Sequence, residues 1–581
     1  MPLSSFDRLR IKTLRQVSPL PSIVLIFLVG VMLSLPLFVA GFPRSSADGI
    51  YHATCYSNFA EQLWSGEVYP RWMYKMNAGL GSPTFYYYPP FAFYFTSVLK
   101  PLFPKERYGW HQLGISAAIA LIASGIFMYF WLKRITGGRT ALLGAVIYLI
   151  VPYHVAEDLY GRGAFAEVWA FVWMPLILCL VHEVHRKARF CSLALAASVA
   201  FLLLTHLLTA MIFLPLAGAY ACFLGYSGRS YRVTLVTAGA ICLGFGLSSL
   251  YWIPALFART SVFFDEFRTG YFYYGNWLLG KQLHLGGSLR YFWMVFEVAI
   301  LLGSAFLVLK SRLKRTQKPA FWFWGTIILC SAFMMTSASK FVWEAIPPLQ
   351  MLQFPWRFNA ILAVAICPVF ALFVSTLKKK FRFSDLGIVA VVAFILLVWI
   401  YGLGKKECGS FETSAKPSLD EARSAMLVIA ADVNPMRPKS VASLAPAELI
   451  KIVEKVGQVP PQLARKALIG EVGTTFLHWK PRDIAFEIDA SADAVVTIPQ
   501  FYYPGWTAYL DGSPRTLAIK PSAEGLIRID SPAGRHRVQL RLDKSKEEKA
   551  GELLSLTSLL LTAMTALSSH CRALRRKNSQ S

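Results

Sequence analysis

Long apolar segments separated by short polar loops repeat along the whole chain. Runs of about 18 or more apolar residues are typical of membrane-spanning helices, because about 20 residues cross the hydrocarbon core of a bilayer. The pattern predicts about twelve spans. They lie near 20–41, 109–132, 140–155, 168–184, 190–208, 210–225, 233–256, 289–309, 320–338, 358–377, 384–403 and 551–569. We therefore predict a mainly α-helical, polytopic transmembrane bundle.

Half of the polar segments between these spans are short and rich in lysine and arginine. Clusters of basic residues begin at Arg8, Lys133, Arg186, Arg229, Lys310, Lys378 and Arg572. Lysine and arginine accumulate in short cytoplasmic loops. If the N-terminus is inside, every one of these clusters falls on the cytoplasmic side. The pattern therefore predicts that both termini are cytoplasmic. The first segment is long for a cleaved signal peptide, so we expect a retained anchor.

The opposite, outer segments are longer and carry acids, aromatics, glycine and proline. They are 42–108, 156–167, 257–288, 339–357 and 404–550. Binding and catalytic residues lie preferentially in such loops. We predict a transmembrane domain at 1–403 that includes the outer loop 42–108. An extracytoplasmic domain at 404–550 and a final helix with a basic tail at 551–581 complete the chain.

The extracytoplasmic domain changes its pattern part-way along. Residues 404–472 contain helical stretches and read as a linker. From 473 to 545, segments such as DIAFEIDA and HRVQLRL alternate apolar and polar positions, with turn signals at DGSP and SPAG. This predicts a small antiparallel β-sandwich. Within it, FYYPGWTAYLDGSP (501–514) fits a strand, a bend and a hairpin, although its aromatics would also suit carbohydrate contact.

Composition supports a membrane protein and excludes other classes. The chain is 55% hydrophobic, with a mean hydropathy of +0.46. The net charge of +26 is gathered in clusters between spans, so it encodes topology and no nucleic-acid partner is expected. The nine cysteines form no zinc-binding pattern. A bridge between Cys55 and Cys408, the two that would face outside, is left open.

The stretch ADGIYH (47–52) opens an amphipathic helix in the first outer loop. Asp48 has two interpretations. Aspartate is a favoured N-cap that stabilises a helix by about 1 kcal/mol. A carboxylate at the membrane surface can also act as a general base toward an acceptor hydroxyl. His52 lies one turn later, where it is either a packed core residue or a substrate contact on the same face as Asp48.

Charged residues in the other outer loops are further candidates. In HVAEDLYGRGAFAE, the acids Glu157 and Asp158 would either pair internally with Arg162 or hold a divalent cation, Mg²⁺ or Mn²⁺. Arg162 and Arg357 carry guanidinium groups suited to phosphate. Arg357 could instead extend to a lipid headgroup. The remaining candidate substrate contacts are Arg71, Tyr87, His206, Arg268 and Lys340.

The aromatic segment FYYYPPFAFYF (85–95) suits the lipid interface. A full span at 89–104 would reverse every later loop, so we expect a juxtamembrane or re-entrant helix there. No P-loop, glycine-rich dinucleotide loop or nucleophile elbow occurs. Chemistry driven by ATP or by cytosolic nucleotide sugars is therefore not indicated.

These motifs together resemble those of known membrane proteins. One span followed by ADGIYH, the helices around YYYPPFAFYF and the acidic loop HVAEDLYGRG are similar to the GT-C class of membrane glycosyltransferases. GLGSPTFYYYPP and LQFPWRF are similar to bacterial 6-pyruvoyl-tetrahydropterin-synthase-related membrane proteins. FYYPGWTAYLDGSP with AGRHRVQLRL resembles the C-terminal module of YfhO-type membrane proteins.

The resemblance implies an enzyme of a bacterial-type inner membrane. It would transfer a sugar from a polyprenyl-phosphate donor to a glycan, lipid or protein acceptor on the outer face, with inversion at the anomeric carbon. Asp48 matches the catalytic acid of the first loop, and Glu157 with Asp158 matches the second acidic loop. Two alternatives stay open: a transporter or flippase of lipid-linked glycans, and an assembly scaffold whose outer sandwich binds glycans.

Overall fold

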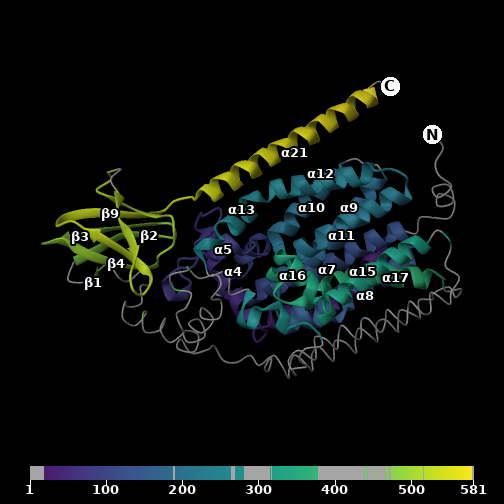
Figure 1. The fold of residues 1–581 in the computed structure, drawn as a ribbon, viewed down its shortest axis with the longest axis horizontal. Helices are drawn as coiled ribbons and strands as arrows, with labels where there is room; N and C mark the ends of the chain where they lie inside the picture. Colours follow the sequence, from purple (N-terminus) through teal and green to yellow (C-terminus); the bar gives the residue numbers. More distant parts are fainter. Residues whose placement is uncertain are drawn as a thin grey trace.

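The structure is a computed structural model, in which a helical bundle carries a β domain at one end (Figure 1). It describes residues 19–106, 108–186, 190–262, 268–279, 317–376, 466–468, 473–513 and 516–578, and the single positions 315, 438, 441 and 452. The C-terminus lies at the end of the bundle that is far from the β domain.

The helices and strands follow one another along the chain in a simple order. The first half holds α2 (Leu20–Leu33), α3 (Leu35–Ala40), α4 (Gly49–Trp64), α5 (Thr84–Tyr87), α6 (Phe91–Ser97), α7 (Trp110–Ile135), α8 (Gly138–Ile150), η3 (Tyr153–Gly161), α9 (Phe165–His185), α10 (Cys191–Thr205), α11 (Leu207–Ser227), α12 (Arg232–Leu247), α13 (Ser249–Phe257) and η4 (Arg259–Ser261). The second half holds α15 (Lys318–Met334), α16 (Lys340–Ala345), η9 (Pro347–Leu352), η10 (Pro355–Arg357), α17 (Phe358–Thr376), strands β1 (Lys466–Leu468), β2 (Gly473–Lys480), β3 (Asp483–Ala490), β4 (Ala494–Phe501), β5 (Trp506–Leu510), β6 (Thr516–Leu517), β7 (Ile519–Pro521), β8 (Leu526–Ser531) and β9 (Gly534–Leu542), and α21 (Lys546–Asn578).

The predicted spans coincide with helices wherever the structure describes them. Among the described residues, six helices are long and apolar enough to cross a membrane, or seven if α12 and α13, bent by 73°, form one broken span. The predicted spans 289–309 and 384–403 lie outside the described residues, so the count of twelve stays a prediction. The expected first span is divided into α2 and α3, because Pro36 cannot continue the hydrogen bonding of α2.

The helices differ in how deeply they are buried. In the most apolar 18-residue stretch of α9, 83% of the residues are buried, whereas in that of α21 only 17% are buried. Helix α9 packs against α7, α10 and α11 in the centre of the bundle. Helix α21 runs along the outside, where it packs against α13 and α12 (Figure 1). Apolar side chains on its outer face, such as Leu559 and Leu560, are suited to lipid contact.

Helix α4 confirms the helix predicted after ADGIYH. The prediction of an exposed polar face along this helix is wrong. In an amphipathic helix Asn58 and Gln62 would lie on the polar face, opposite His52 and Tyr56, and be exposed, yet both are buried. Their amide nitrogens donate hydrogen bonds inside the protein: Asn58 to the Thr54 carbonyl at 2.9 Å, and Gln62 to the Trp72 carbonyl at 3.0 Å. Among the described residues between α4 and α7 all helices are short: α5, α6 and the 3-10 helices Asn77–Gly79 and Lys100–Leu102. The juxtamembrane or re-entrant placement stays a prediction.

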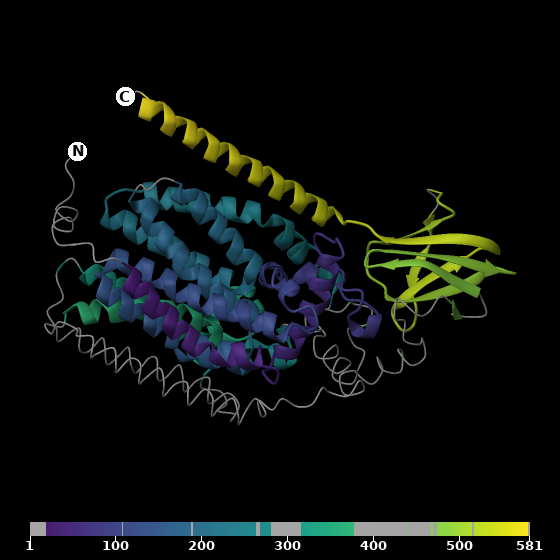
Figure 2. The ribbon, with the colours of Figure 1, turned by 180° about the vertical axis from the view of Figure 1, so that it is seen from behind.

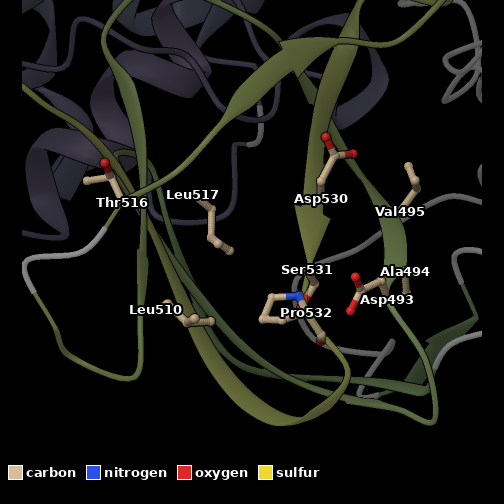
Figure 3. A pocket seen from close by; sticks show the side chains of 9 residues that line it. All are labelled: Asp493, Ala494, Val495, Leu510, Thr516, Leu517, Asp530, Ser531 and Pro532. Carbon is tan, nitrogen blue, oxygen red and sulfur yellow. The ribbon is translucent and has the colours of Figure 1, made fainter.

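The β domain contains two antiparallel sheets. One has the strand order β1-β2-β3-β9-β5-β6, and the other has the order β4-β8-β7. Side chains of both sheets, such as Phe486 and Ile498, belong to the same hydrophobic cluster. A cleft of about 490 Å³ is lined by residues of both sheets, including Val495 of β4 and Leu517 of β6 (Figure 3). A β region at 473–545 is therefore present, and its classification as a sandwich stays a prediction.

The FYYPGW segment docks the β domain onto the first outer loop. The indole of Trp72 donates to Gln500 Oε1 at 2.9 Å, and the Phe501 amide donates to the Leu80 carbonyl at 2.6 Å. The rings of Trp72 and Trp506 meet edge to face, with 5.9 Å between centroids. The view from behind shows the β domain against the early loop segments (Figure 2). These aromatics are therefore part of a contact between two regions of the chain.

Candidate active site

The ends of several helices meet at the end of the bundle that carries the β domain. Because successive helices reverse direction, residues at the end of η3, the start of α9, the α10–α11 junction and the start of α17 share this end. The charges of Glu167 on α9 and His206 at the α10–α11 junction interact with those of Arg162 and Arg357. Four separate elements thus contribute ionisable side chains to one cluster.

The backbone of ADGIYH is locked to the loop after η3. The Asp48 amide donates to the Arg162 carbonyl at 2.8 Å. A Cβ on Gly49 would lie 2.1 Å from the Pro43 carbonyl oxygen, so only glycine fits there. Gly163 has φ +63° and faces Ser46, whose Oγ would lie 2.2 Å from an added Cβ. The glycines of ADG and GRG therefore allow the two loops to approach closely.

Asp48 occupies the N-cap position of α4 but does not cap it. Its carboxylate makes no hydrogen bond to the amides of the first turn. Its charge interacts instead with Arg162, His52 and Tyr88. The side chain is partly exposed. The capping interpretation therefore does not account for this carboxylate, and the general-base interpretation stays a proposal.

The acidic loop HVAEDLYGRG forms the π-helix η3. Such helices are rare and are frequent at functional sites. In η3 the Arg162 amide donates to the Glu157 carbonyl five residues back, at 2.6 Å. The Arg162 guanidinium pairs with Asp158 at 2.7 Å and with Glu167 at 3.2 Å. Glu167 also accepts a hydrogen bond from the Tyr153 hydroxyl at 2.9 Å. The expected internal ion pair is present, and it extends to α9.

Arg357 approaches the same cluster from η10. Its side chain is 8% exposed, and its charge interacts with those of Asp158 and Glu167. Among the described residues, its Nε and Nη1 have no hydrogen-bond partner. The turn before it is strained: Gln353 has φ +64° and ψ −51°, and the Phe354 amide donates to the Leu352 carbonyl at 2.6 Å. Strain of this kind gathers at functional sites.

His52 and Tyr88 form the aromatic side of the cluster. Their ring centroids are 5.9 Å apart. Burial, together with the charge of Asp48, raises the pKa of Tyr88 well above its ordinary value, so its hydroxyl keeps its proton. His206 Nδ1 lies 2.7 Å from the Thr209 hydroxyl. The cluster therefore combines several carboxylates with two guanidinium groups, two histidines and a phenol.

The stability of the protein should fall in mild acid because of His52. This side chain is 2% exposed, and burial lowers its pKa from 6.5 to about 4, partly opposed by Asp48. Between these two values the unfolded chain binds a proton that the folded chain does not bind. We therefore expect a loss of about 3 kcal/mol as the pH falls from 6.5 to 4. Thermal unfolding of wild type and His52→Gln at several pH values measures this loss of stability. Equal pH dependence in both proteins would contradict it.

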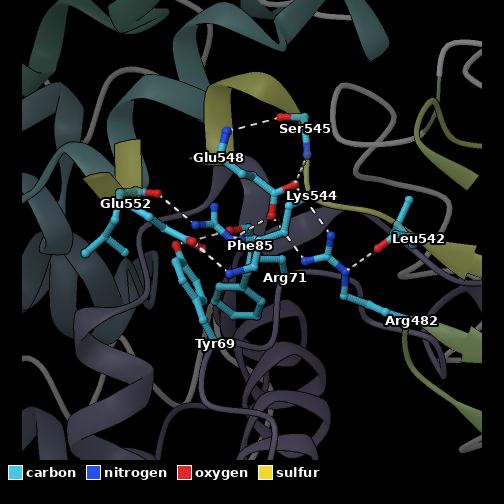
Figure 4. A network of polar contacts seen from close by, with 10 residues as sticks. Tyr69, Arg71, Phe85, Arg482, Leu542, Lys544, Ser545, Glu548 and Glu552 are labelled. Carbon is cyan, nitrogen blue, oxygen red and sulfur yellow. Dashed lines mark hydrogen bonds and ion pairs between the residues drawn. The ribbon is translucent and has the colours of Figure 1, made fainter. Parts of the chain in front are cut away.

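Arg71 lies in a different cluster, between the first outer loop, the β domain and α21. Its Nε lies 3.3 Å from Glu548 of α21, and both side chains are almost fully buried (Figure 4). Arg482, between β2 and β3, pairs with the same carboxylate at 3.1 Å. Arg71 also donates to the Leu250 carbonyl at 2.8 Å and covers the Tyr69 ring. These contacts engage Nε and Nη2 of Arg71 at a junction of three regions, and among the described residues its Nη1 has no hydrogen-bond partner.

The other predicted substrate contacts are also placed apart from Asp48. The Tyr87 hydroxyl bonds the Ala258 carbonyl and the Tyr503 hydroxyl of the β domain. Lys340 is exposed and pairs with Glu344 at 3.3 Å on α16. Arg268 is exposed. The structure therefore brings Asp48, His52, Glu157, Asp158, Arg162, His206 and Arg357 to one end of the bundle, and it leaves Arg71, Tyr87, Arg268 and Lys340 outside the cluster.

The acids Glu157 and Asp158 do not fit the predicted metal site. In the part of the chain that the structure describes, no group of three or more His, Cys, Asp or Glu side chains could hold a metal ion. Asp158 is paired with Arg162, whose positive charge competes directly with a cation. No step of the proposed reaction is therefore assigned to a divalent cation.

Sequence reasoning missed Glu167, Tyr88 and Tyr153 as members of the site. Glu167 is visible as a charge at the start of a span, which is expensive unless paired. Tyr88 ends the triplet YYY, and the sequence does not distinguish it from Tyr86 and Tyr87. Tyr153 gave no signal, because a tyrosine at a span end also fits the lipid interface.

Three solved structures resemble the fold. The oligosaccharyltransferase of Archaeoglobus fulgidus in its apo form has a TM-score of 0.41 and 13% identity, over 71% of this chain and 60% of that chain. ArnT from Cupriavidus metallidurans bound to undecaprenyl phosphate has a TM-score of 0.38 and 15% identity, over 75% of this chain and 73% of that chain. The arabinosyltransferase EmbB from Mycobacterium smegmatis has a TM-score of 0.35 and 13% identity, over 93% of this chain and 65% of that chain.

Sequence comparison identifies one curated relative and one family. An uncharacterized protein of Lactococcus lactis subsp. cremoris is 23% identical over 243 residues, which is 40% of this chain. The chain matches about two fifths (39%) of the length of that relative. The family of the 6-pyruvoyl-tetrahydropterin synthase related domain, described as a membrane protein, matches residues 85–404, more than half of the 581-residue chain. The chain therefore belongs to the family of 6-pyruvoyl-tetrahydropterin-synthase-related membrane proteins.

Proposed function

We propose that this protein is a membrane glycosyltransferase that moves a sugar from a polyprenyl-phosphate donor to an extracytoplasmic glycan, lipid or protein acceptor. One observation carries the proposal. The uncapped carboxylate of Asp48 interacts with the charge of the buried Arg162, which follows η3, and both lie beside Tyr88 together with the buried Arg357 of η10. A negatively charged base beside positively charged phosphate ligands is the arrangement that attack on a phosphate-linked sugar requires.

Asp48 is the base of the proposed reaction. Its carboxylate accepts the proton of the acceptor hydroxyl while the acceptor oxygen bonds the anomeric carbon. The bond between that carbon and the phosphate oxygen breaks, and its electron pair leaves with the polyprenyl phosphate. Attack opposite the leaving group inverts the anomeric carbon. Asp48 suits this role because its oxygens are not used by the helix amides and its side chain is partly exposed.

Arg357 is the proposed ligand of the donor phosphate. Among described residues its Nε and Nη1 lack partners, so these N–H groups are available to phosphate oxygens. Arg162 is already bound by Asp158 and Glu167. It contributes positive charge near Asp48 and holds η3 against α9. Donors fixed in advance stabilise the charge that develops on the leaving phosphate without reorganising during the reaction.

The proposal includes an orientation in the membrane. The domains 1–403, 404–550 and 551–581, about twelve spans and cytoplasmic termini follow from the clusters of basic residues. The candidate active site then faces the outside of a bacterial-type inner membrane, beside the β domain. A lipid-linked donor would reach it from the bilayer, and an acceptor would reach it from the aqueous side.

Binding of lipid phosphate tests the role of Arg357. We expect Arg357→Gln to weaken binding of undecaprenyl phosphate by about 10-fold to 100-fold, because hydrogen bonds to charged groups are worth about 1.5 to 3 kcal/mol. Titration of the purified protein in nanodiscs measures the affinity. Arg528→Gln, which removes an exposed guanidinium of β8, is the matched control.

Two outcomes would contradict the proposal. Equal affinity in wild type and Arg357→Gln would remove Arg357 from the donor site. Movement of labelled lipid across the bilayer without any covalent product would indicate a transporter in place of a transferase.

A further inference from the structure

We propose that the β domain positions Tyr88 at the candidate active site through a direct contact between Tyr503 and Tyr87. The inference rests on the proposed function only because Tyr88 belongs to that site. Its structural part concerns three consecutive tyrosines whose side chains go to different neighbours. Tyr86 and Tyr87 are buried against the β domain, whereas Tyr88 is partly exposed beside His52.

The contact begins at a cluster of hydroxyl groups. The hydroxyls of Tyr87 and Tyr503 lie 2.9 Å apart. Tyr87 donates its single hydroxyl proton to the Ala258 carbonyl at 2.8 Å. Tyr503 must therefore be the donor to Tyr87. The Ser261 hydroxyl of η4 is close to both tyrosines, and its single proton can be donated to one of them. The first outer loop, the segment after α13 and the β domain thus meet at one buried point.

Tyr87 is fixed at its backbone as well as at its hydroxyl. Its carbonyl accepts a hydrogen bond from the Tyr251 hydroxyl of α13 at 2.8 Å. Next to it, the Tyr86 ring packs on the Tyr503 ring, with 5.3 Å between centroids. Tyr503 itself is 4% exposed and also contacts Trp72. The position of Tyr87 is therefore determined by residues that lie far from it in sequence.

The geometry passes directly from Tyr87 to Tyr88. Tyr88 precedes Pro89, and the residue before a proline is restricted to extended backbone. Tyr88 has φ −91° and ψ 133°, as this restriction requires. Because its own backbone has little freedom, a displacement of Tyr87 must move the Tyr88 ring. That ring lies among the charges of Asp48, Arg162 and Arg357. Tyr503 is therefore a positioning residue for the candidate site.

A fluorine label at position 88 tests the inference in the full-length protein. 3-Fluorotyrosine is placed at position 88, or at position 87 in a parallel sample, and ¹⁹F NMR is recorded in nanodiscs. We expect Tyr503→Phe to shift the resonances of both labels. Tyr509→Phe, a change in the same β domain at a hydroxyl that bonds Asp543, should shift neither. If Tyr503→Phe proves unstable, Ser261→Ala is the second variant. It removes the third hydroxyl and should also shift both resonances.

Each result decides the inference. A shift at position 87 without one at position 88 would overturn it, and so would no shift at either label. Where sugar transfer is detected, Tyr503→Phe should lower kcat about 10-fold with KM little changed, because donor binding by Arg357 is untouched. If the wild type transfers no sugar, the proposed function fails. The fluorine spectra still decide the positioning role.

Discussion

Asp48→Asn should abolish sugar transfer while leaving the protein folded. A general base contributes about 100-fold to 10,000-fold to a reaction rate, and an amide cannot accept the acceptor proton. Unlike a capping aspartate, Asp48 makes no side-chain hydrogen bond to the first turn of α4. The substitution should therefore cost less than the roughly 1 kcal/mol of a lost cap. Release of polyprenyl phosphate from a polyprenyl-phosphate sugar, followed in membranes and in nanodiscs, measures the rate.

The control for this experiment is Asp489→Asn, on an exposed position of β3. It changes the same functional group in the β domain, outside the cluster around Asp48, and should leave transfer unchanged. Undecaprenyl phosphate should bind Asp48→Asn at least as well as wild type, because the substitution removes a negative charge near the phosphate. Transfer at the wild-type rate by Asp48→Asn would refute the general-base role.

The positions of the described helices along the chain could be predicted from the sequence because they depend on local properties. Apolar length and the position of basic clusters determine where a span begins and ends, and neither requires knowledge of contacts. The polar face of α4 could not be predicted in this way. Asn58 and Gln62 are buried because particular carbonyls, at Thr54 and Trp72, receive their amides. An amphipathic pattern does not show which polar groups will find partners inside the protein.

The candidate site was partly predictable for a similar reason. Asp48, Arg162 and Arg357 stand out because charges near the membrane are costly unless they are used or paired. Arg71 stands out for the same reason, yet it pairs with Glu548, which is 477 residues later in the chain (548 − 71). Nothing near Arg71 in sequence indicates that pairing. Burial of charge thus identifies important residues, but it does not separate a catalytic role from a structural one.

The cluster around Glu548 predicts the largest stability effect in the molecule. Glu548 is 1% exposed and is the shared partner of Arg71 and Arg482. Its carboxylate also accepts the Ser545 amide at 3.0 Å, while the Ser545 hydroxyl accepts the Glu548 amide, which forms a capping box at the start of α21. One carboxylate therefore joins the outer loop, the β domain and the last helix.

We expect Glu548→Gln to lower the free energy of unfolding by about 3 kcal/mol, because the buried guanidinium of Arg71 and the partly exposed one of Arg482 lose their counter-charge. The amide keeps an oxygen for the capping box, so the loss reports on charge more than on helix capping. Glu552→Gln, one turn later, removes an exposed partner of Lys544 and should cost less than about 1 kcal/mol. Denaturant titration in mixed micelles measures both. Equal stability of the two variants would mean that water solvates Arg71 and Arg482 in place of Glu548. The junction would then not depend on the ion pairs of Glu548.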